Sequence, residues 1–216
     1  MKKALATSLL VGATLVPMLQ GCVPLVAAGA TQATLSTIDR RSLGTQTDDE
    51  TIEWKAASAV GEKIGEHAHT NFTSYNRKVL ASGEVPSEEI KAEVERVVAG
   101  IPQVQGVYNE LAIAAATSFS VRSNDSYITT KVKARFVDAG KFNAVYVKVV
   151  TENGVVYLLG LVTQREADAA IQVARTTSDV KKVVNLMEII SAARVKELQP
   201  HVEPGQPANP DDIGGG

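Results

Sequence analysis

The 216-residue chain contains two copies of one sequence pattern. Residues 79–85 and 156–162 are both apolar runs with a glycine two positions before a closing valine, and Asn76 and Asn153 precede them at the same offset. Four later positions also correspond: Val104, Val107, Asn109 and Ile113 match Val180, Val183, Asn185 and Ile189. Chance similarity between two amphipathic segments is the alternative. The joint match of glycine, asparagine and valine favours a duplicated domain.

Each copy is predicted to fold as helix, strand, strand, helix, strand. In the second copy these elements are a helix over 124–139, strands over 145–151 and 155–162, a helix that begins after Thr163, and a last strand over 180–190. The first helix has Ile128, Val132 and Phe136 on one face and ends at Gly140. Asn153-Gly154 indicates a two-residue hairpin turn, because both residues tolerate positive φ. Residues 163–166 (Thr-Gln-Arg-Glu) have the pattern of a capping box.

The first copy follows the same order. Residues 47–50 (Thr-Asp-Asp-Glu) also have the capping-box pattern and are predicted to open a helix. Strands near 71–75 and 79–83 follow, and then an amphipathic helix after Ser87. Each copy thus places two helices on one face of a small three-stranded sheet, an α+β fold. A unit of about 70 residues is marginal alone, so we expect the two copies to pack together.

The N-terminus has the features of a secretory signal. Met1-Lys2-Lys3 precedes an apolar run over 4–19 that is too short for a dependable membrane-spanning helix. The run ends in Leu19-Gln20-Gly21-Cys22, which resembles the bacterial lipobox, the motif for cleavage and lipid attachment at its cysteine. We therefore expect an acylated Cys22. A structural cysteine beside an ordinary signal is the alternative.

The expected layout has five parts. They are a lipoprotein signal peptide over 1–21, a lipidated flexible tether over 22–45, the two domains over 46–115 and 123–193, and a disordered tail over 197–216. The tail is rich in proline and glycine and cannot bury enough apolar surface to order itself.

The composition excludes several classes of protein. Hydrophobic residues make up 44% of the chain, which excludes global disorder, and a net charge of −2 with 5% aromatic residues argues against nucleic-acid binding. One cysteine and three histidines exclude an internal disulfide and a Cys/His zinc cluster.

His67 and His69 alternate near the end of the first predicted helix with no acid or cysteine at ligand spacing, so a surface or half-buried pair is favoured over a metal site. No G-x-S-x-G, P-loop or H-E-x-x-H motif occurs, so we expect no enzyme, cofactor or metal.

The near-neutral total conceals a polarised charge distribution. Residues 46–114 hold six Lys and Arg against twelve Asp and Glu, a net charge of −6, whereas residues 125–148 hold five against two, a net charge of +3. The second copy could therefore be attracted to an anionic surface, where each cation contributes about 1 kcal/mol.

The lipobox, the two repeats with Gly83 and Gly160, and the segments 123–133, 151–154 and 159–163 together resemble the dual BON-domain outer-membrane lipoproteins. The resemblance implies a lipid-anchored protein on the periplasmic face of the outer membrane that supports envelope integrity. It also implies binding to anionic phospholipid (phosphatidylglycerol and cardiolipin) and enrichment at the division site. Val23, where an aspartate would signal inner-membrane retention, agrees with the outer membrane.

In that family the lipid-binding surface lies on the first helix of the second BON domain. Carried over, the phospholipid-binding residues are Tyr127, Thr130, Lys131, Lys133, Ala134, Arg135 and Val137. Tyr127 replaces the usual tryptophan and still offers an amphipathic ring for the headgroup region. Ile128 and Val132 are assigned to the core, and helical spacing makes Tyr127, Lys131 and Ala134 the better exposed candidates.

Two alternatives remain open. The three cations of this helix could form an ordinary solvated face, and the chain could be an interaction adaptor whose acidic first repeat docks to the outer-membrane protein assembly machinery. Gly83 and Gly160 are expected to be structural or interdomain residues. For Gly83 the simpler role is a backbone bulge without room for a Cβ atom.

Overall fold

The computed structural model describes residues 39–65 and 68–198. The first domain contains α2 (Leu43–Ile64), β1 (His69–Tyr75), β2 (Lys78–Val85), α3 (Glu88–Ala99), β3 (Gly106–Asn109) and β4 (Ala112–Ile113). The second contains α4 (Phe119–Ala139), the 3₁₀ helix η2 (Ala144–Tyr146), β5 (Val147–Glu152), β6 (Val155–Val162), α5 (Gln164–Arg175), β7 (Lys182–Asn185) and β8 (Glu188–Ile189), and is followed by α6 (Ala192–Leu198). The two domains repeat one order of elements, which confirms the predicted α+β fold.

The two sheets share one topology. In the first domain, β2 pairs antiparallel with β1 on one side and parallel with β3 and β4 on the other. In the second, β6 pairs in the same way with β5, β7 and β8. The last strand of each domain is broken in two, and Leu111 and Met187 at the breaks are buried in the core. The single strand predicted over 180–190 is therefore two short strands.

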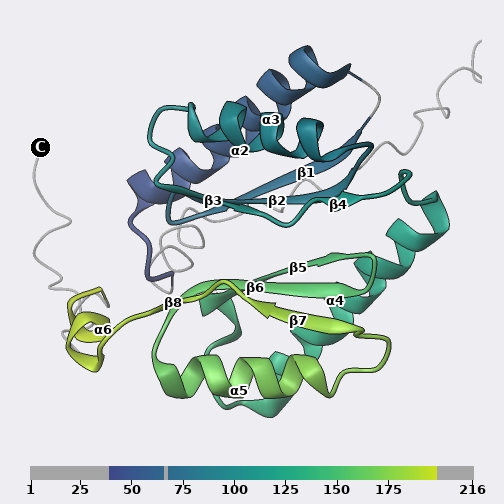
Figure 1. Cartoon of the computed structure of the whole chain (residues 1–216). Coiled ribbons are helices and arrows are strands. Elements are labelled where there is room, and N and C mark those ends of the chain that lie inside the picture. The colour runs from purple at the N-terminus through teal and green to yellow at the C-terminus, as the bar shows by residue number, and fades with distance from the viewer. Residues whose placement is uncertain (1–38, 66–67, 199–216) are drawn as a thin grey trace, which may run out of the picture.

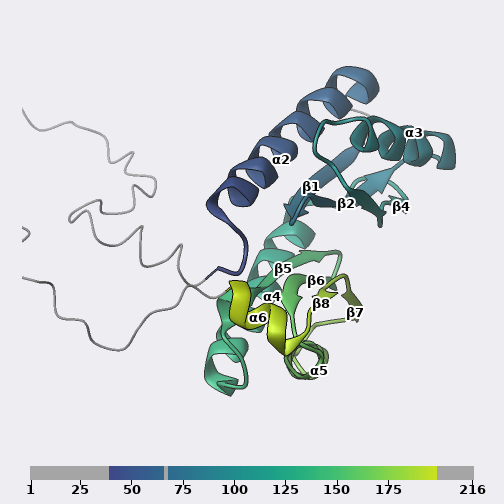
Figure 2. The same ribbon diagram turned by 90° about the vertical axis from the view of Figure 1, so that its left-hand side faces the viewer.

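Each sheet has one face under its two helices and one face against the other domain (Figure 1). Under the helices lie two separate apolar cores, one in each domain. A third core lies between the sheets and joins the domains; its buried members are Tyr75, Leu80, Tyr157, Leu159 and Leu161. The expectation that the two copies pack together is confirmed. α2, α3, α4 and α5 lie on the outside of this four-layer arrangement (Figures 1 and 2).

The two hairpin turns are built alike. Asn153 and Gly154 have φ of 48° and 77°, as expected for a two-residue turn, and Asn76 and Arg77 have φ of 52° and 62°. In each domain a buried aspartate of the first helix accepts the two turn amides. Asp125 bonds Asn153 N at 2.8 Å and Gly154 N at 2.7 Å. Asp49 bonds Asn76 N at 2.8 Å and Arg77 N at 2.7 Å.

Two helix starts differ from the predictions. α2 begins at Leu43 with Ser42 as N-cap, so residues 47–50 lie inside the helix and do not form a capping box. The Thr47 hydroxyl instead donates to the Leu43 carbonyl. α4 begins at Phe119, earlier than the predicted residue 124. The capping box at Thr163 and Glu166 is confirmed.

Some residues predicted to belong to the flexible tether or to the tail are ordered parts of the fold. Arg40, within the predicted tether, is 3% exposed and binds the second domain through Glu166 and the Leu161 carbonyl. Residues 197 and 198, within the predicted tail, belong to α6. Cys22 and the signal segment lie outside the described residues. Within 39–65 and 68–198, no helix combines the length and apolar character needed to cross a membrane.

Candidate functional site

α4 presents two opposite faces. Toward the sheet it buries Asp125, Ile128, Val132 and Phe136, which recur every three or four residues. Ile128 and Val132 are therefore core residues, as predicted. From its first turns beside the gap between the domains, the helix runs along the outer side of the second sheet (Figure 1).

The outward face of α4 carries an exposed ridge, which we define as Tyr127, Thr130, Ala134 and Val137. These positions are three or four residues apart and share one side of the helix. Tyr127 is 61% and Val137 is 68% exposed, and the two smaller residues between them are also exposed. The ridge thus offers an aromatic ring and an aliphatic side chain that are both mostly exposed.

The cations of this helix differ in their freedom. Lys133 is exposed, whereas the Lys131 side chain is only 19% exposed. Lys131 donates to Asp179 Oδ2 and to the Ser178 carbonyl at 3.0 Å, and its ammonium lies 4.7 Å from the Tyr127 ring centroid. The hydrogen bond from Lys131 lowers the pKa of Asp179. The prediction that Lys131 is among the better exposed residues is wrong, because the loop after α5 provides this partner.

Two further cations are engaged within the molecule. Arg135 donates to the Val173 carbonyl and to the hydroxyls of Thr176 and Thr177 at the end of α5. Lys148 points into the domain interface. The freely exposed cations on and near α4 are Arg122, Lys133 and Lys141.

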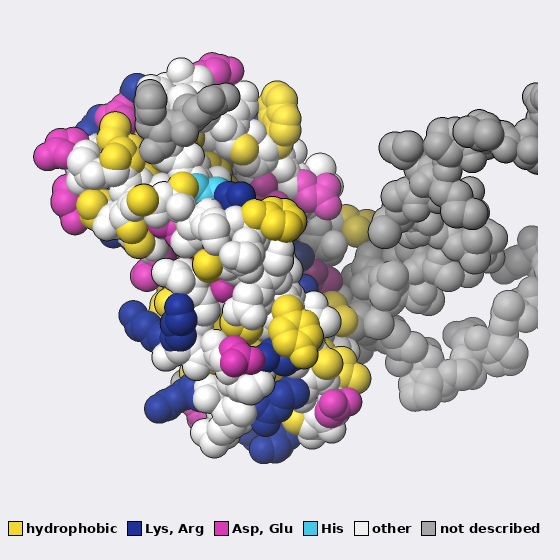
Figure 3. Space-filling view, turned by 90° about the vertical axis from the view of Figure 1, so that its right-hand side faces the viewer, with side chains coloured by type: hydrophobic (Ala, Val, Ile, Leu, Met, Phe, Trp, Pro, Cys, Tyr) yellow, Lys and Arg dark blue, Asp and Glu magenta, His cyan; other side chains and the backbone are white. Residues whose placement is uncertain are grey.

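Arg122 and the exposed Phe119 belong to the first turns of α4, which precede the helix predicted over 124–139. Phe119 is 77% exposed. Its signal in the sequence is Ser118, a residue suited to an N-cap one position earlier. Hydrophobic and basic side chains gather on this side of the second domain, and most acidic side chains in the same view lie on the first domain (Figure 3).

Gly83 and Gly160 occupy equivalent places on the central strands. A Cβ atom at Gly83, whose φ is +115°, would lie 2.0 Å from the His69 carbonyl oxygen. At Gly160 it would lie 2.4 Å from the Tyr146 carbonyl oxygen. Both positions therefore require glycine because a neighbouring backbone approaches closely, in agreement with the backbone role considered for Gly83.

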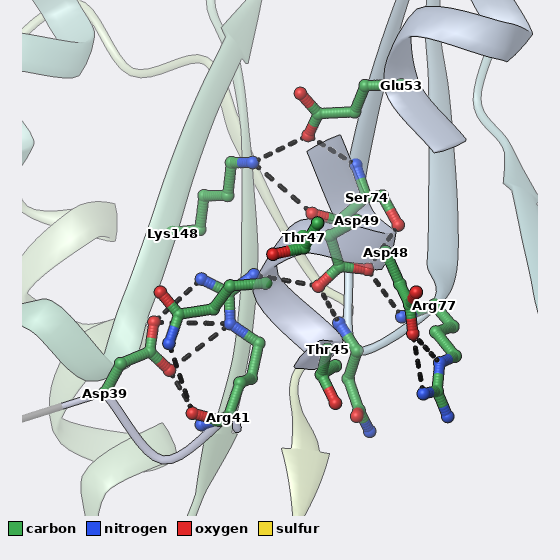
Figure 4. A network of polar contacts seen from close by, with 12 residues as sticks. Asp39, Arg41, Thr45, Thr47, Asp48, Asp49, Glu53, Ser74, Arg77 and Lys148 are labelled. Carbon is green, nitrogen blue, oxygen red and sulfur yellow. Dashed lines mark hydrogen bonds and ion pairs between the residues drawn. The ribbon is translucent and has the colours of Figure 1, made fainter. Parts of the chain in front are cut away.

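A polar network joins the domains at the start of α2 (Figure 4). Lys148 of β5 donates to Glu53 Oε1 at 2.8 Å and to the Ser74 carbonyl at 3.3 Å. Beside it, Arg41 pairs with Asp49 at 2.8 Å and stacks on the Tyr75 ring at 4.0 Å. Burial raises the pKa of Tyr75 to about 12. This end of the interface is held by cations paired with acids.

A second polar cluster lies in the same interface. His69 is in β1, not at the end of the first helix, and its Nδ1 donates to Glu84 Oε2 at 3.1 Å and lies 3.9 Å from Glu152 Oε1. Burial raises the pKa of Glu152. His69 is half-buried, one of the two placements expected for it. Its acid neighbours do not follow from spacing in the sequence, because pairing of β1 with β2 and packing of the sheets bring the two carboxylates to it.

Comparisons with known proteins agree with this architecture. The family model of the BON domain matches residues 48–115 and 124–191. The chain is 41% identical over 185 residues to the outer membrane lipoprotein DolP of Haemophilus influenzae, covering 85% of this chain and 95% of that protein. It is 36% identical to a 21 kDa hemolysin of Actinobacillus pleuropneumoniae, covering 71% and 80%. It is 29% identical to the osmotically-inducible protein Y of Escherichia coli, covering 66% and 73%.

Proposed function

Because this chain belongs to the BON-domain family and carries two BON domains, we propose that it is an outer-membrane lipoprotein that binds anionic phospholipid through α4. The relative that is 41% identical to this chain is an outer membrane lipoprotein, and the match covers 95% of its length. The lipobox at Cys22 supplies the corresponding attachment site in this chain. Anchored there, the protein would lie on the periplasmic face of the membrane.

The observation that carries the proposal is the exposed ridge of α4. Tyr127 and Val137 are large side chains left in solvent on a helix that buries its opposite face against the sheet. A tyrosine ring suits the headgroup region, and an aliphatic side chain can enter the acyl boundary beneath it. Because the ridge faces away from the first domain, it can reach a bilayer while the domains stay packed.

Charge supports the same orientation. Arg122, Lys133 and Lys141 are exposed on or beside α4, and each contributes about 1 kcal/mol near an anionic surface. A few kcal/mol is too little to hold a free protein firmly. It is enough to orient a protein already anchored by acyl chains and to concentrate it where anionic lipid is rich, such as the division site. From its place at the anionic membrane surface, the protein would support the integrity of the envelope.

Vesicle flotation tests the proposal with a chain that begins at Val23 and so lacks the acylated cysteine. We expect it to float with phosphatidylglycerol or cardiolipin vesicles and not with phosphatidylcholine vesicles. Lys133→Glu changes the local charge by two units and should weaken binding about tenfold to thirtyfold. Tyr127→Ala should weaken it through loss of the ring.

Lys196→Glu is the matched control, because it makes the same charge change at an exposed position on a different helix, α6. Its binding should equal that of the parent chain. Lys131→Glu is a weaker test than Lys133→Glu, since it also removes the contact with Asp179. Equal flotation of the parent, Tyr127→Ala and Lys133→Glu chains would contradict the proposal.

A second candidate function is that of an adaptor for outer-membrane protein assembly factors, and the outer face of the first domain favours it. Trp54, the single tryptophan of the chain, is 70% exposed beside a shallow hollow of about 500 Å³ between α2 and α3. α2 and α3 also carry exposed acids: Glu50, Glu62, Glu88, Glu89 and Glu95. If this function holds, Trp54→Ala should abolish co-purification of an envelope protein and leave vesicle flotation unchanged.

A further inference from the structure

Outside α4, the domain interface contains a cluster of three side chains that can bind a metal ion, His69, Glu84 and Glu152. The three residues come from β1, β2 and β5, and therefore from both domains. One potential ligand atom of each lies within 4.8 Å of the other two. Glu84 is 3% and Glu152 is 8% exposed.

The two carboxylates have little positive charge beside them. Both pair with His69, and within residues 39–65 and 68–198 neither has a lysine or arginine at ion-pair distance. The opposite end of the interface, by contrast, pairs Lys148 with Glu53 and Lys78 with Glu188. An isolated buried carboxylate is costly unless a cation or hydrogen bonds offset it. One imidazole shared by two carboxylates leaves room for a further cation.

The geometry points to a divalent metal, and we propose that His69, Glu84 and Glu152 form a Zn²⁺ site that bridges the two BON domains. Imidazole nitrogen and carboxylate oxygen are both common zinc ligands, and two ligands about 2.1 Å from a tetrahedral ion lie about 3.4 Å apart. The distances from His69 Nδ1 to the two carboxylates, 3.1 and 3.9 Å, lie on either side of that value. Small rotations of these side chains would complete three ligands, with a water as the fourth.

The surroundings also suit a metal. Ligating carboxylates are usually held by their own hydrogen bonds. Here Asn71 Nδ2 donates to Glu152 Oε2 at 3.0 Å, and the Thr117 amide and hydroxyl donate to Glu84 Oε2 at 3.1 and 3.3 Å. Thr117 belongs to the segment that links the domains. The His69 side chain is 19% exposed, so an ion can enter from solvent.

The proposed site goes beyond phospholipid binding, because it fixes the two domains relative to each other. A ligand that binds only the folded protein raises its melting temperature. Zn²⁺ should therefore raise the Tm of the chain, and excess EDTA should reverse the rise.

Titration calorimetry with ZnCl₂ on the full chain in a mild detergent tests the proposal. We expect one saturable site near pH 7.5 and at least a tenfold loss of affinity in His69→Asn and in Glu152→Gln, one from each domain. His69→Cys, which keeps a zinc ligand, should retain binding. Circular dichroism and Tm without zinc show whether each variant is folded, and His69→Cys keeps the test decisive if another variant is not.

Two controls separate this site from other zinc binding. Glu188→Gln removes a different interface acid, one paired with Lys78, and should leave zinc affinity unchanged. His201→Ala removes a histidine far along the chain from the cluster and should also have no effect. The proposal is overturned if the parent chain shows no saturable binding up to about 1 mM Zn²⁺, if His69→Asn and Glu152→Gln bind as tightly as the parent, or if His201→Ala alone abolishes binding.

Discussion

At the scale of single residues, the buried aspartates of the first helices hold the hairpin turns. Asp125→Ala would leave the amides of Asn153 and Gly154 without their acceptor, and we expect it to cost about 2–4 kcal/mol of unfolding free energy. Urea unfolding measures this cost. Asp138→Ala, on the exposed side of the same helix, is the control and should change stability by less than about 0.5 kcal/mol. Equal costs for the two variants would show that the turn does not depend on the carboxylate.

Asp49 should be the more costly of the pair to remove. It accepts the amides of Asn76 and Arg77, the Ser74 hydroxyl at 2.6 Å and a guanidinium hydrogen bond from Arg41. Arg77 also has a positive φ without being glycine, so this turn relies more on its acceptor than the Asn-Gly turn does. The same unfolding measurement should therefore rank Asp49→Ala above Asp125→Ala. The reverse order would contradict this explanation.

At the scale of elements, the two faces of α4 should respond differently to truncation. Ile128 is fully buried beneath the helix, so Ile128→Ala should cost about 2–5 kcal/mol. Val137→Ala on the exposed ridge should cost less than about 0.5 kcal/mol. Chemical unfolding of the two variants checks both values. A large cost for Val137→Ala would mean that the ridge is part of the fold and not a free surface.

The elements also show what local sequence can and cannot predict. The hairpin at Asn153-Gly154, the capping box at Thr163 and the buried stripe of α4 were predictable, because each depends on residues within one turn of helix or hairpin. The start of α2 was not, because Thr47 and Ser42 have equally suitable side chains and only the structure shows which one lies outside the helix. The exposure of Tyr127 and Ala134 followed from helical spacing, whereas the partner of Lys131 on the loop after α5 did not.

At the scale of the whole molecule, contacts between the domains determine the partners of several charged residues, which the local sequence does not reveal. Lys148 and His69 resembled free surface residues in the sequence, and packing of the two sheets turned both toward acids more than 80 positions away. Arg40 is the most distant case. Its guanidinium binds Glu166 through two hydrogen bonds of 2.8 Å, donates to the Leu161 carbonyl and stacks on Tyr146 at 3.8 Å. The segment before the first domain is thereby fixed to the second.

The stability contributed by the Arg40–Glu166 ion pair should depend on pH. Burial tends to raise the pKa of Glu166, but hydrogen bonds from Arg40 and Thr163 outweigh it, and the folded-state pKa is lowered from 4.5. An acid with a lowered pKa stabilises the fold fully above its unfolded value, and this contribution is lost as pH falls through the folded value. Glu166→Gln should therefore cost about 1.5–3 kcal/mol at neutral pH, because Arg40 stays buried without its counter-ion. The cost should shrink below about pH 4.5, where the parent chain also loses the charge.

Glutamine can still serve in the capping box with Thr163, so the substitution isolates the ion pair from the helix cap. Urea unfolding of the parent and Glu166→Gln chains between pH 7 and about pH 3 gives the difference at each pH. Glu197→Gln, which breaks the exposed pair with Arg194, is the control and should show little cost at any pH. A Glu166→Gln cost that stays constant down to the lowest pH would mean that the glutamate acts through its shape and not its charge. The charge of Glu166 would then add nothing to the attachment of the N-terminal segment to the second domain.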